Sequence, residues 1–278
     1  MNGPEYLAQQ VGRLKTRVGG FFPGSHVVFR GHNLHTDLKD MDWMELYVFG
    51  ICGRRFSAQQ LRLMNALWTY TSYPDARIWN NRVAALTGTA RSTGNLGLSA
   101  ALAISEAHIY GRGNEVQAIA FFISTQKRLA AGETLSACIQ DEMKAHHRIA
   151  GYGRPLINAD ERIAPIMAQA KALGLESGPH LQLAFSIEQH LLENGRNLRL
   201  NYGGVVSAFG ADLGMSQEEF YLFMFPSFLA GMSPCFQEAR DETEGSLFPL
   251  RCADILYEGT APRAWRLLPE EEPGSIRN

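Results

Sequence analysis

The sequence of 278 residues contains few cysteines, no excess of positive charge and no long apolar run. The four cysteines, Cys52, Cys138, Cys235 and Cys252, are scattered. They form no CxxC pair and no Cys/His pair at zinc spacing, so we expect no metal. Lys and Arg total 26 against 28 for Asp and Glu, which gives a formal net charge of −2. The basic excess typical of duplex-binding proteins is therefore missing, and no nucleic-acid partner is expected.

The longest apolar stretch, Phe220–Met232, is interrupted by Pro226 and is too short to cross a bilayer, which takes about 20 residues. The first part of the chain lacks the apolar segment of a secretory signal. We therefore expect no membrane partner, and a location in the reducing cytoplasm with free thiols. The hydrophobic share of 45% predicts a well-buried core in one large or two small domains.

Helix signals recur along the chain, whereas strand signals are few. Capping-box patterns pair Ser57 with Gln60, Asn158 with Glu161, and Ser216 with Glu219. Gly174 is expected to end the second of these helices, and Pro226 to kink or split the third. Further helical segments are Val83–Ala107, Val116–Leu129, Glu133–Ile149 and Pro179–Glu193. Period-2 alternation is limited to Ser25–Arg30 and Arg251–Tyr257. The pattern predicts an all-α fold.

Three glycine-rich turns separate the predicted helices: Tyr110–Glu115, Gly151–Pro155 and Asn201–Gly204. Glycine lets a backbone approach a ligand closely, and the N-terminus of a helix attracts anions. Two interpretations are open: the turns surround one cleft, or they are ordinary helix connectors.

In their order, these segments resemble the citrate synthase superfamily, and especially its short citryl-CoA lyase-like branch. The segments that carry the resemblance are Phe29–Leu34, Trp43–Gly50, Val83–Thr89, Ile109–Glu115, Gly151–Pro155, Asp160–Arg162, Leu200–Val205 and Arg251–Gly259. The resemblance implies a two-domain helical fold and a homodimer. A small domain, residues 114–205, is inserted into a large domain made of residues 1–113 and 206–278.

The chemistry of that family uses two histidines and one aspartate, which enolise an acyl-CoA and polarise the carbonyl that is attacked. In this chain the corresponding positions are Tyr110, Arg154 and Gly203. Glycine cannot accept a proton, and arginine stays charged at any working pH. Tyrosine can donate a hydrogen bond to an enolate oxygen. Ordinary citrate synthesis is therefore not expected.

The anion-binding part of the family pattern is retained. Arg162 and Arg251 match arginines that bind substrate carboxylates in the family, and Arg154 adds a third guanidinium. A guanidinium meets a carboxylate in two hydrogen bonds, so the three predict a ligand with several carboxylates, or a phosphate. The candidate catalytic residues are Tyr110, Arg154 and Asn201. The candidate substrate-binding residues are Arg162, Arg251, Asn81, Arg82, Gly111, Gly153 and Gly203.

For three further side chains, the sequence leaves both a functional and a structural role open. His108 precedes Tyr110 by two residues and is a possible substitute for the missing histidine, although on a helix such a pair points to different faces. Glu115 and Asp160 are the carboxylates nearest to the turns. Either is a relocated base or the cap of a helix N-terminus, and capping is the commoner role.

The sequence leaves three functional hypotheses open. The first is an enzyme that makes or breaks a bond next to a carbonyl in a small carboxylic acid or acyl-CoA. It has no resident cofactor, and a coenzyme A thioester is a possible substrate. The alternative is a non-catalytic, ligand-binding or regulatory homologue, which the loss of the acid–base residues favours. A structural subunit of a larger synthase complex is the third.

Overall fold

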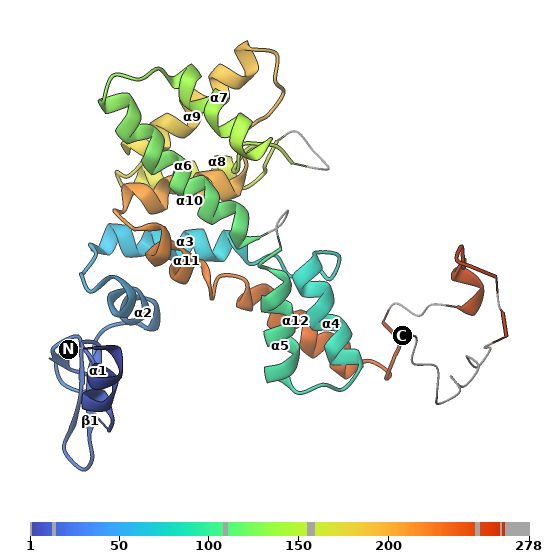
Figure 1. Ribbon diagram of the computed structural model, residues 1–278, viewed down its shortest axis with the longest axis horizontal. Coiled ribbons are helices and arrows are strands. Elements are labelled where there is room, and N and C mark those ends of the chain that lie inside the picture. The colour runs from blue at the N-terminus through green and yellow to red at the C-terminus, as the bar shows by residue number, and fades with distance from the viewer. Residues whose placement is uncertain are drawn as a thin grey trace, which may run out of the picture. The chain divides into compact units, whose positions relative to one another are not determined.

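The computed structural model describes residues 2–12, 15–107, 111–154, 159–247, 251–261 and 263–264 (Figure 1). The chain divides into two units, Met1–Leu247 and Phe248–Asn278. Helices dominate the described residues, so the all-α prediction is confirmed. They are α1 Gly3–Gln10, α2 Trp43–Cys52, α3 Ala58–Thr71, α4 Trp79–Thr89, α5 Gly94–Ile104, α6 Arg112–Ala130, α7 Leu135–His146, α8 Ile163–Ala172, α9 Pro179–Glu193, α10 Tyr202–Asp212, α11 Gln217–Met224 and α12 Leu229–Asp241. Within the described part of the chain, no helix combines the length and apolarity that crossing a membrane requires.

A small antiparallel sheet precedes α2. It consists of β1 Gly19–Phe22, β2 His26–Phe29 and β3 His32–Asn33, paired in that order. The alternation over residues 25–30 thus predicted a strand correctly. The Arg30 guanidinium donates hydrogen bonds to the carbonyl oxygen of Gly50 at 2.6 and 3.0 Å, which ties the end of β2 to α2.

Two of the predicted capping boxes are present. The Ser57 side chain accepts the Gln60 amide at the start of α3, and the Ser216 side chain accepts the Glu219 amide at the start of α11. The segment around Pro226 separates α11 from α12, as predicted. Proline lacks the amide hydrogen that continues a helix, and α11 ends with Phe225 as its C-cap, directly before Pro226.

The remaining local predictions are partly wrong. Helix α8 begins at Ile163 with Arg162 as its N-cap and no side-chain cap, so the predicted Asn158–Glu161 box is wrong. Asn158 itself lies outside the described residues. Gly174, at φ +70°, does follow the end of α8. The helical segment 83–107 is two helices, since Arg91 adopts φ +57° between α4 and α5.

Helix α10 lies at the centre of the principal core. Nearly all its side chains are buried, because α6 and α9 pack against it (Figure 1). Tyr202 at its first turn is 1% exposed, and Phe209 near its end is equally buried. A separate apolar cluster joins α4, α5 and α12 through Ala84, Ala101 and Phe236. The predicted domain boundaries at residues 114 and 205 stay a prediction.

Candidate functional site

The N-terminus of α10 is where two of the glycine turns meet. Asn201 caps α10, and its side-chain oxygen accepts the Gly204 amide at 3.0 Å. Its side-chain amide donates to the carbonyl oxygen of Gly153 at 2.9 Å, and its backbone amide donates to that of Gly151 at 2.9 Å. A side chain at Gly204 would lie 2.5 Å from the Gly151 carbonyl oxygen, so only glycine permits this approach.

The first turn of α6 packs against the same part of α10. The Ser207 hydroxyl lies 2.9 Å from the carbonyl oxygen of Glu115 and 2.7 Å from that of Gly203. Gly111 is the N-cap of α6 and adopts φ +81°, a conformation that favours glycine. The three glycine-rich turns, for which a shared cleft and a role as ordinary connectors were both open, are therefore neighbours around the start of α10. Tyr110 and His108 lie outside the described residues.

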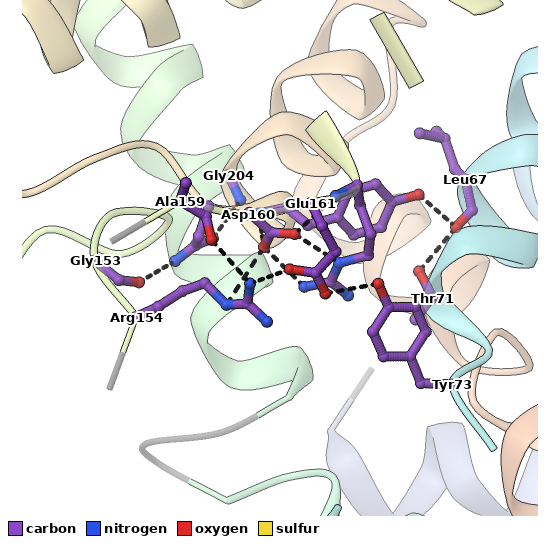
Figure 2. A network of polar contacts seen from close by, with 12 residues as sticks. Leu67, Thr71, Tyr73, Gly153, Arg154, Ala159, Asp160, Glu161 and Gly204 are labelled. Carbon is purple, nitrogen blue, oxygen red and sulfur yellow. Dashed lines mark hydrogen bonds and ion pairs between the residues drawn. The ribbon is translucent and has the colours of Figure 1, made fainter. Parts of the chain in front are cut away.

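A cluster of two arginines and two carboxylates lies beside these turns (Figure 2). Arg162 grips Asp160 with Nε and Nη2, each at 2.8 Å. Asp160 is completely buried and also accepts the backbone amide of Tyr202 at 2.9 Å. Asp160 therefore fixes Arg162 and satisfies an amide in the first turn of α10. Of the two roles considered for this residue, the structure supports capping.

Arg154 makes the second half of the cluster. Its Nη1 donates to the Glu161 carboxylate at 2.6 Å and to the Ala159 carbonyl oxygen at 3.2 Å. Its Nε lies 3.8 Å from Asp160. The Tyr73 hydroxyl donates to the other oxygen of Glu161 at 2.8 Å, on the side away from Arg154 (Figure 2). The side chain of Glu161 is 56% exposed, whereas that of Asp160 is not exposed at all.

Aromatic rings hold Arg162 in place. Its guanidinium carbon lies 4.4 Å from the centre of the Tyr202 ring and 5.0 Å from the centre of the Tyr73 ring. Tyr202 is anchored in turn by a hydrogen bond from its hydroxyl to the carbonyl oxygen of Leu67 at 2.9 Å. These cation–π contacts and the two bonds to Asp160 leave Arg162 little freedom.

Both carboxylates of the cluster are ionised at neutral pH. Hydrogen bonds from Arg154, from a backbone amide and from Tyr73 lower the pKa of Glu161 to about 2. Burial by itself raises the pKa of Asp160, but its hydrogen bonds with Arg162 and backbone amides outweigh burial and lower it. The four side chains therefore carry two positive and two negative charges.

Glu115 is a third carboxyl group beside the cluster, and the sequence left it two roles, a relocated base or a helix cap. The N-cap of α6 is Gly111, and no side chain caps the helix, so Glu115 does not have the capping role. The residue is buried, and its Oε2 has no hydrogen-bond partner among the described residues. Burial raises the pKa of Glu115 to about 7, against the opposing influence of Arg162 and Arg112.

Arg112 is a buried arginine that the sequence patterns did not single out. It donates to the carbonyl oxygens of Phe225 at 3.1 Å and Leu102 at 3.2 Å, and it pairs with Glu106 at 2.6 Å. The only sequence signal was its place between two glycines in the first turn. Its partners show that it joins α6 to neighbouring segments.

The remaining candidates belong to other segments of the chain. Asn81 is buried, and its side-chain amide donates to the carbonyl oxygens of Tyr73 and Asp75, so it supports the segment that carries Tyr73. Arg82 follows on α4 and is exposed. Arg251 belongs to the second unit, where it pairs with Asp254 at 2.7 Å. That segment contains the 3₁₀ turn η1, Cys252–Asp254, so the strand predicted for it is wrong. Among the described residues, no three acidic, histidine or cysteine side chains gather as a metal site would require.

Comparison with known proteins identifies the fold. No protein-family model matches the chain, and no curated protein sequence matches it. The structure of citryl-CoA lyase from Hydrogenobacter thermophilus matches with a TM-score of 0.79 and 18% identity, covering 91% of this chain and 98% of that chain. ATP citrate lyase from Methanosaeta concilii, solved in complex with (3S)-citryl-CoA, matches with a TM-score of 0.71 and 17% identity. That match covers 94% of this chain but only 45% of the ATP citrate lyase chain.

Citrate synthase from Thermoplasma acidophilum, solved with carboxymethyl coenzyme A and oxaloacetate, gives a TM-score of 0.64 at 17% identity. The match covers 83% of this chain and 60% of that one. The three matches agree on one helical architecture, and the resemblance in the sequence motifs points to the same architecture. The chain therefore has the fold shared by citryl-CoA lyase and citrate synthase.

Proposed function

We propose that this protein belongs to the citrate synthase superfamily and binds a small polycarboxylic acid or its coenzyme A thioester. It makes or breaks a carbon–carbon bond next to a carbonyl, with an altered set of active-site residues. The fold likeness and the bound molecules named for two of the matching structures support this substrate class. A cytoplasmic homodimer is part of the proposal, and it rests on the sequence resemblance.

The observation that carries the proposal is the pair Arg154 and Arg162 beside the two glycine turns and the start of α10. Asp160 is buried and grips Arg162 with two bonds, so this guanidinium supplies a fixed positive charge. Arg154 is paired with the exposed Glu161, which can move into solvent. We therefore assign Arg154 as the residue that exchanges Glu161 for a carboxylate of the ligand.

The neighbouring backbone suits an anionic ligand as well. Gly153 is half-buried and adopts φ +82°, and Gly203 lies in the first turn of α10. The amides of Tyr202, Gly204 and Gly153 are bonded to Asp160, Asn201 and the Arg199 carbonyl oxygen. We therefore assign the positive end of the α10 dipole, and not these amides, to favour the negative charge of the ligand. Asn201 orients the two glycine turns through its three hydrogen bonds. Tyr110, Gly111, Asn81, Arg82 and Arg251 remain proposed ligand contacts on the resemblance.

The test combines binding and turnover. The protein is titrated calorimetrically with citrate and with coenzyme A. It is also incubated with citryl-CoA and with pairs of acyl-CoA and 2-oxo acids, and the acyl-CoA and 2-oxo acid products are followed by mass spectrometry. We expect binding of a polycarboxylate, and formation or cleavage of a carbon–carbon bond with at least one substrate. Arg154→Gln should weaken binding about tenfold or more, the value of a charge-assisted hydrogen bond.

Arg128→Gln is the matched control. Arg128 also pairs with two carboxylates, Glu133 and Asp141, but it lies in the last turn of α6 and not beside α10. Its removal should leave the affinity unchanged. Polycarboxylate binding without any turnover would favour the non-catalytic alternative, which the glycine at position 203 supports. Absence of both binding and turnover would contradict the proposal.

A further inference from the structure

Glu115 is a buried carboxyl group that the fold does not use as a structural partner. It lies in the first turn of α6, yet it caps no helix. Arg162 directs its Nε and Nη2 at Asp160, and Arg112 directs its two Nη atoms at two carbonyl oxygens and Glu106. Among the described residues, neither Nε of Arg112 nor Oε2 of Glu115 has a hydrogen-bond partner. A buried acceptor without a donor costs stability, so its presence calls for a role outside folding.

Gly203 lies directly over this carboxyl group. A methyl group placed on Gly203 would lie 3.3 Å from Cγ and 3.7 Å from Oε1 of Glu115. Glu115 is buried, whereas Gly203 is half-buried at the edge of the core. The same methyl group would lie 3.3 Å from Oδ1 of Asn201. The Glu115 carboxyl group therefore stands beside the place where a side chain at position 203 would begin.

The Glu115 carboxyl group also interacts electrostatically with nearby guanidinium groups. Arg162 acts on Glu115 as a nearby positive charge, and so does Arg112. Glu115 therefore lies near Arg162, the partner of Arg154 in the pair that carries the proposed ligand site. A proton acceptor is thus present beside the arginine pair.

We propose that Glu115 is the general base of this site and removes a proton from the carbon beside the thioester carbonyl of an acyl-CoA. This assignment rests on the proposed function and supplies the proton acceptor that Gly203 cannot be. A buried carboxyl beside Gly203 takes over the role, and the acceptor comes from α6 instead of α10.

In the forward direction the Glu115 carboxylate takes the proton, the C–H electron pair forms the carbon–carbon double bond of an enolate, and the carbonyl π pair moves to oxygen. The electron pair of the enolate double bond then forms a carbon–carbon bond to the keto carbon of a 2-oxo acid, and an oxygen pair restores the thioester carbonyl. The keto π pair moves to the keto oxygen, which takes a proton from solvent, and Glu115 releases its proton to solvent. In the cleavage direction the hydroxyl proton leaves to solvent, the carbon–carbon bond breaks, and protonated Glu115 returns its proton to the carbon.

The ionisation of Glu115 suits this role. Its pKa of about 7 leaves a large fraction of the group ionised at neutral pH, and a base of that pKa accepts a proton from carbon better than an ordinary carboxylate. The described charged or titratable groups that act on it are Arg112 on its own helix, Arg162 before α8 and Tyr202 on α10. The two arginines favour the ionised form, and burial disfavours it.

The test is exchange of carbon-bound protons. Acetyl-CoA and propionyl-CoA are incubated with the protein in D₂O, with and without oxaloacetate, and deuterium in the acyl group is measured by mass spectrometry. Wild type should catalyse exchange, at a rate that rises with pH and levels off above about pH 7. Glu115→Gln, which keeps size and removes the base, should lose between about 10² and 10⁴-fold. Glu115→Asp should restore part of the rate.

Glu142→Gln is the matched control, because Glu142 is also largely buried, at 14% exposure, and accepts a hydrogen bond from Gln117 on a different part of α6. It should exchange at the wild-type rate. Exchange by Glu115→Gln at the wild-type rate and with the same pH profile would overturn the base assignment while leaving the proposed function intact. A wild-type protein that binds citrate but exchanges no proton would overturn it too. Failure of both binding and exchange would overturn both proposals.

Discussion

Arg154 and Glu161 form an ion pair in which Nη1 lies 2.6 Å from a carboxylate that is more than half exposed. The neighbouring pair, Arg162 with Asp160, has the opposite character, because its carboxylate is fully buried. One arginine of the cluster is thus held by a fixed partner and the other by a replaceable one. This difference leads to distinct expectations for the two carboxylates.

Removing the replaceable partner should improve ligand binding. In Glu161→Ala, Arg154 no longer has a competing carboxylate, so the affinity for citrate should rise by about two- to fivefold, the value of an exposed ion pair. Isothermal titration calorimetry measures the change. Because the pKa of Glu161 is about 2, the gain should be the same at pH 5 and pH 8. Glu133→Ala removes a comparable partner from Arg128 and should leave the affinity for citrate unchanged. A loss of affinity in Glu161→Ala would contradict the proposal that a ligand carboxylate replaces Glu161 at Arg154.

Removing the fixed partner should destabilise the protein. Asp160→Asn weakens both bonds to Arg162 and leaves a largely buried guanidinium without a counter-charge, so we expect a loss of about 3 kcal/mol in unfolding free energy. Urea denaturation at pH 7 measures it. Asp141→Asn, which affects an exposed pair with Arg128, should unfold like wild type. Equal stability of the two variants would show that the buried pair does not hold this turn.

The unpaired carboxyl of Glu115 gives stability an unusual pH dependence. Its native pKa of about 7 exceeds the ordinary value of 4.5, so between these pH values the native state binds a proton that the unfolded state has lost. The unfolding free energy therefore falls as pH rises through this window. Glu115→Gln should match wild type near pH 4 and exceed it by up to about 3 kcal/mol at pH 8. Denaturant melts at both pH values measure the difference, and a constant difference would contradict the shifted pKa.

The contact between Gly151 and Gly204 should not tolerate a side chain. Gly151 adopts φ +89°, and a methyl group there would lie 2.8 Å from Gly204 Cα. Gly132 adopts a similar φ of +91° but has open space around it. Gly132→Ala should thus report backbone strain alone, about 1–2 kcal/mol, and Gly151→Ala should cost about 2 kcal/mol more. Circular dichroism melts in urea compare the two, and equal losses would mean that the turns are not in close contact.

The sequence predicted those parts of the fold that local interactions decide. Ser57 and Ser216 bind amides three residues ahead, and proline at position 226 ends a helix without help from distant residues. Prediction failed where a side chain finds a partner outside its expected motif. Glu161 binds Arg154 and Tyr73 instead of capping α8. Asp254 binds the side chain and the amide of Arg251, which gives a 3₁₀ turn in place of a strand.

The candidate site was predictable only in outline. Glycine-rich turns can be read from the sequence, and Asn201 was expected beside them. Whether a carboxyl near such a turn is buried depends on what packs over it, and this is decided by tertiary contacts. Glu115 looked like a capping residue because it follows the Gly111 turn, yet α10 covers it. Arg112 was overlooked because its partners are backbone carbonyls distant in sequence.

The Arg154–Glu161 pair also has a consequence for which ligands the proposed site binds. An entering carboxylate replaces one that is attached to the same chain, whose effective concentration at Arg154 is in the millimolar range or above. A free monocarboxylate such as acetate must compete with this tethered group and gains no second contact in return. A molecule with two or three acid groups gains further contacts for the same displacement. Under the proposed function, Glu161 is thus a competitor within the chain that disfavours simple acids and favours polyvalent ones.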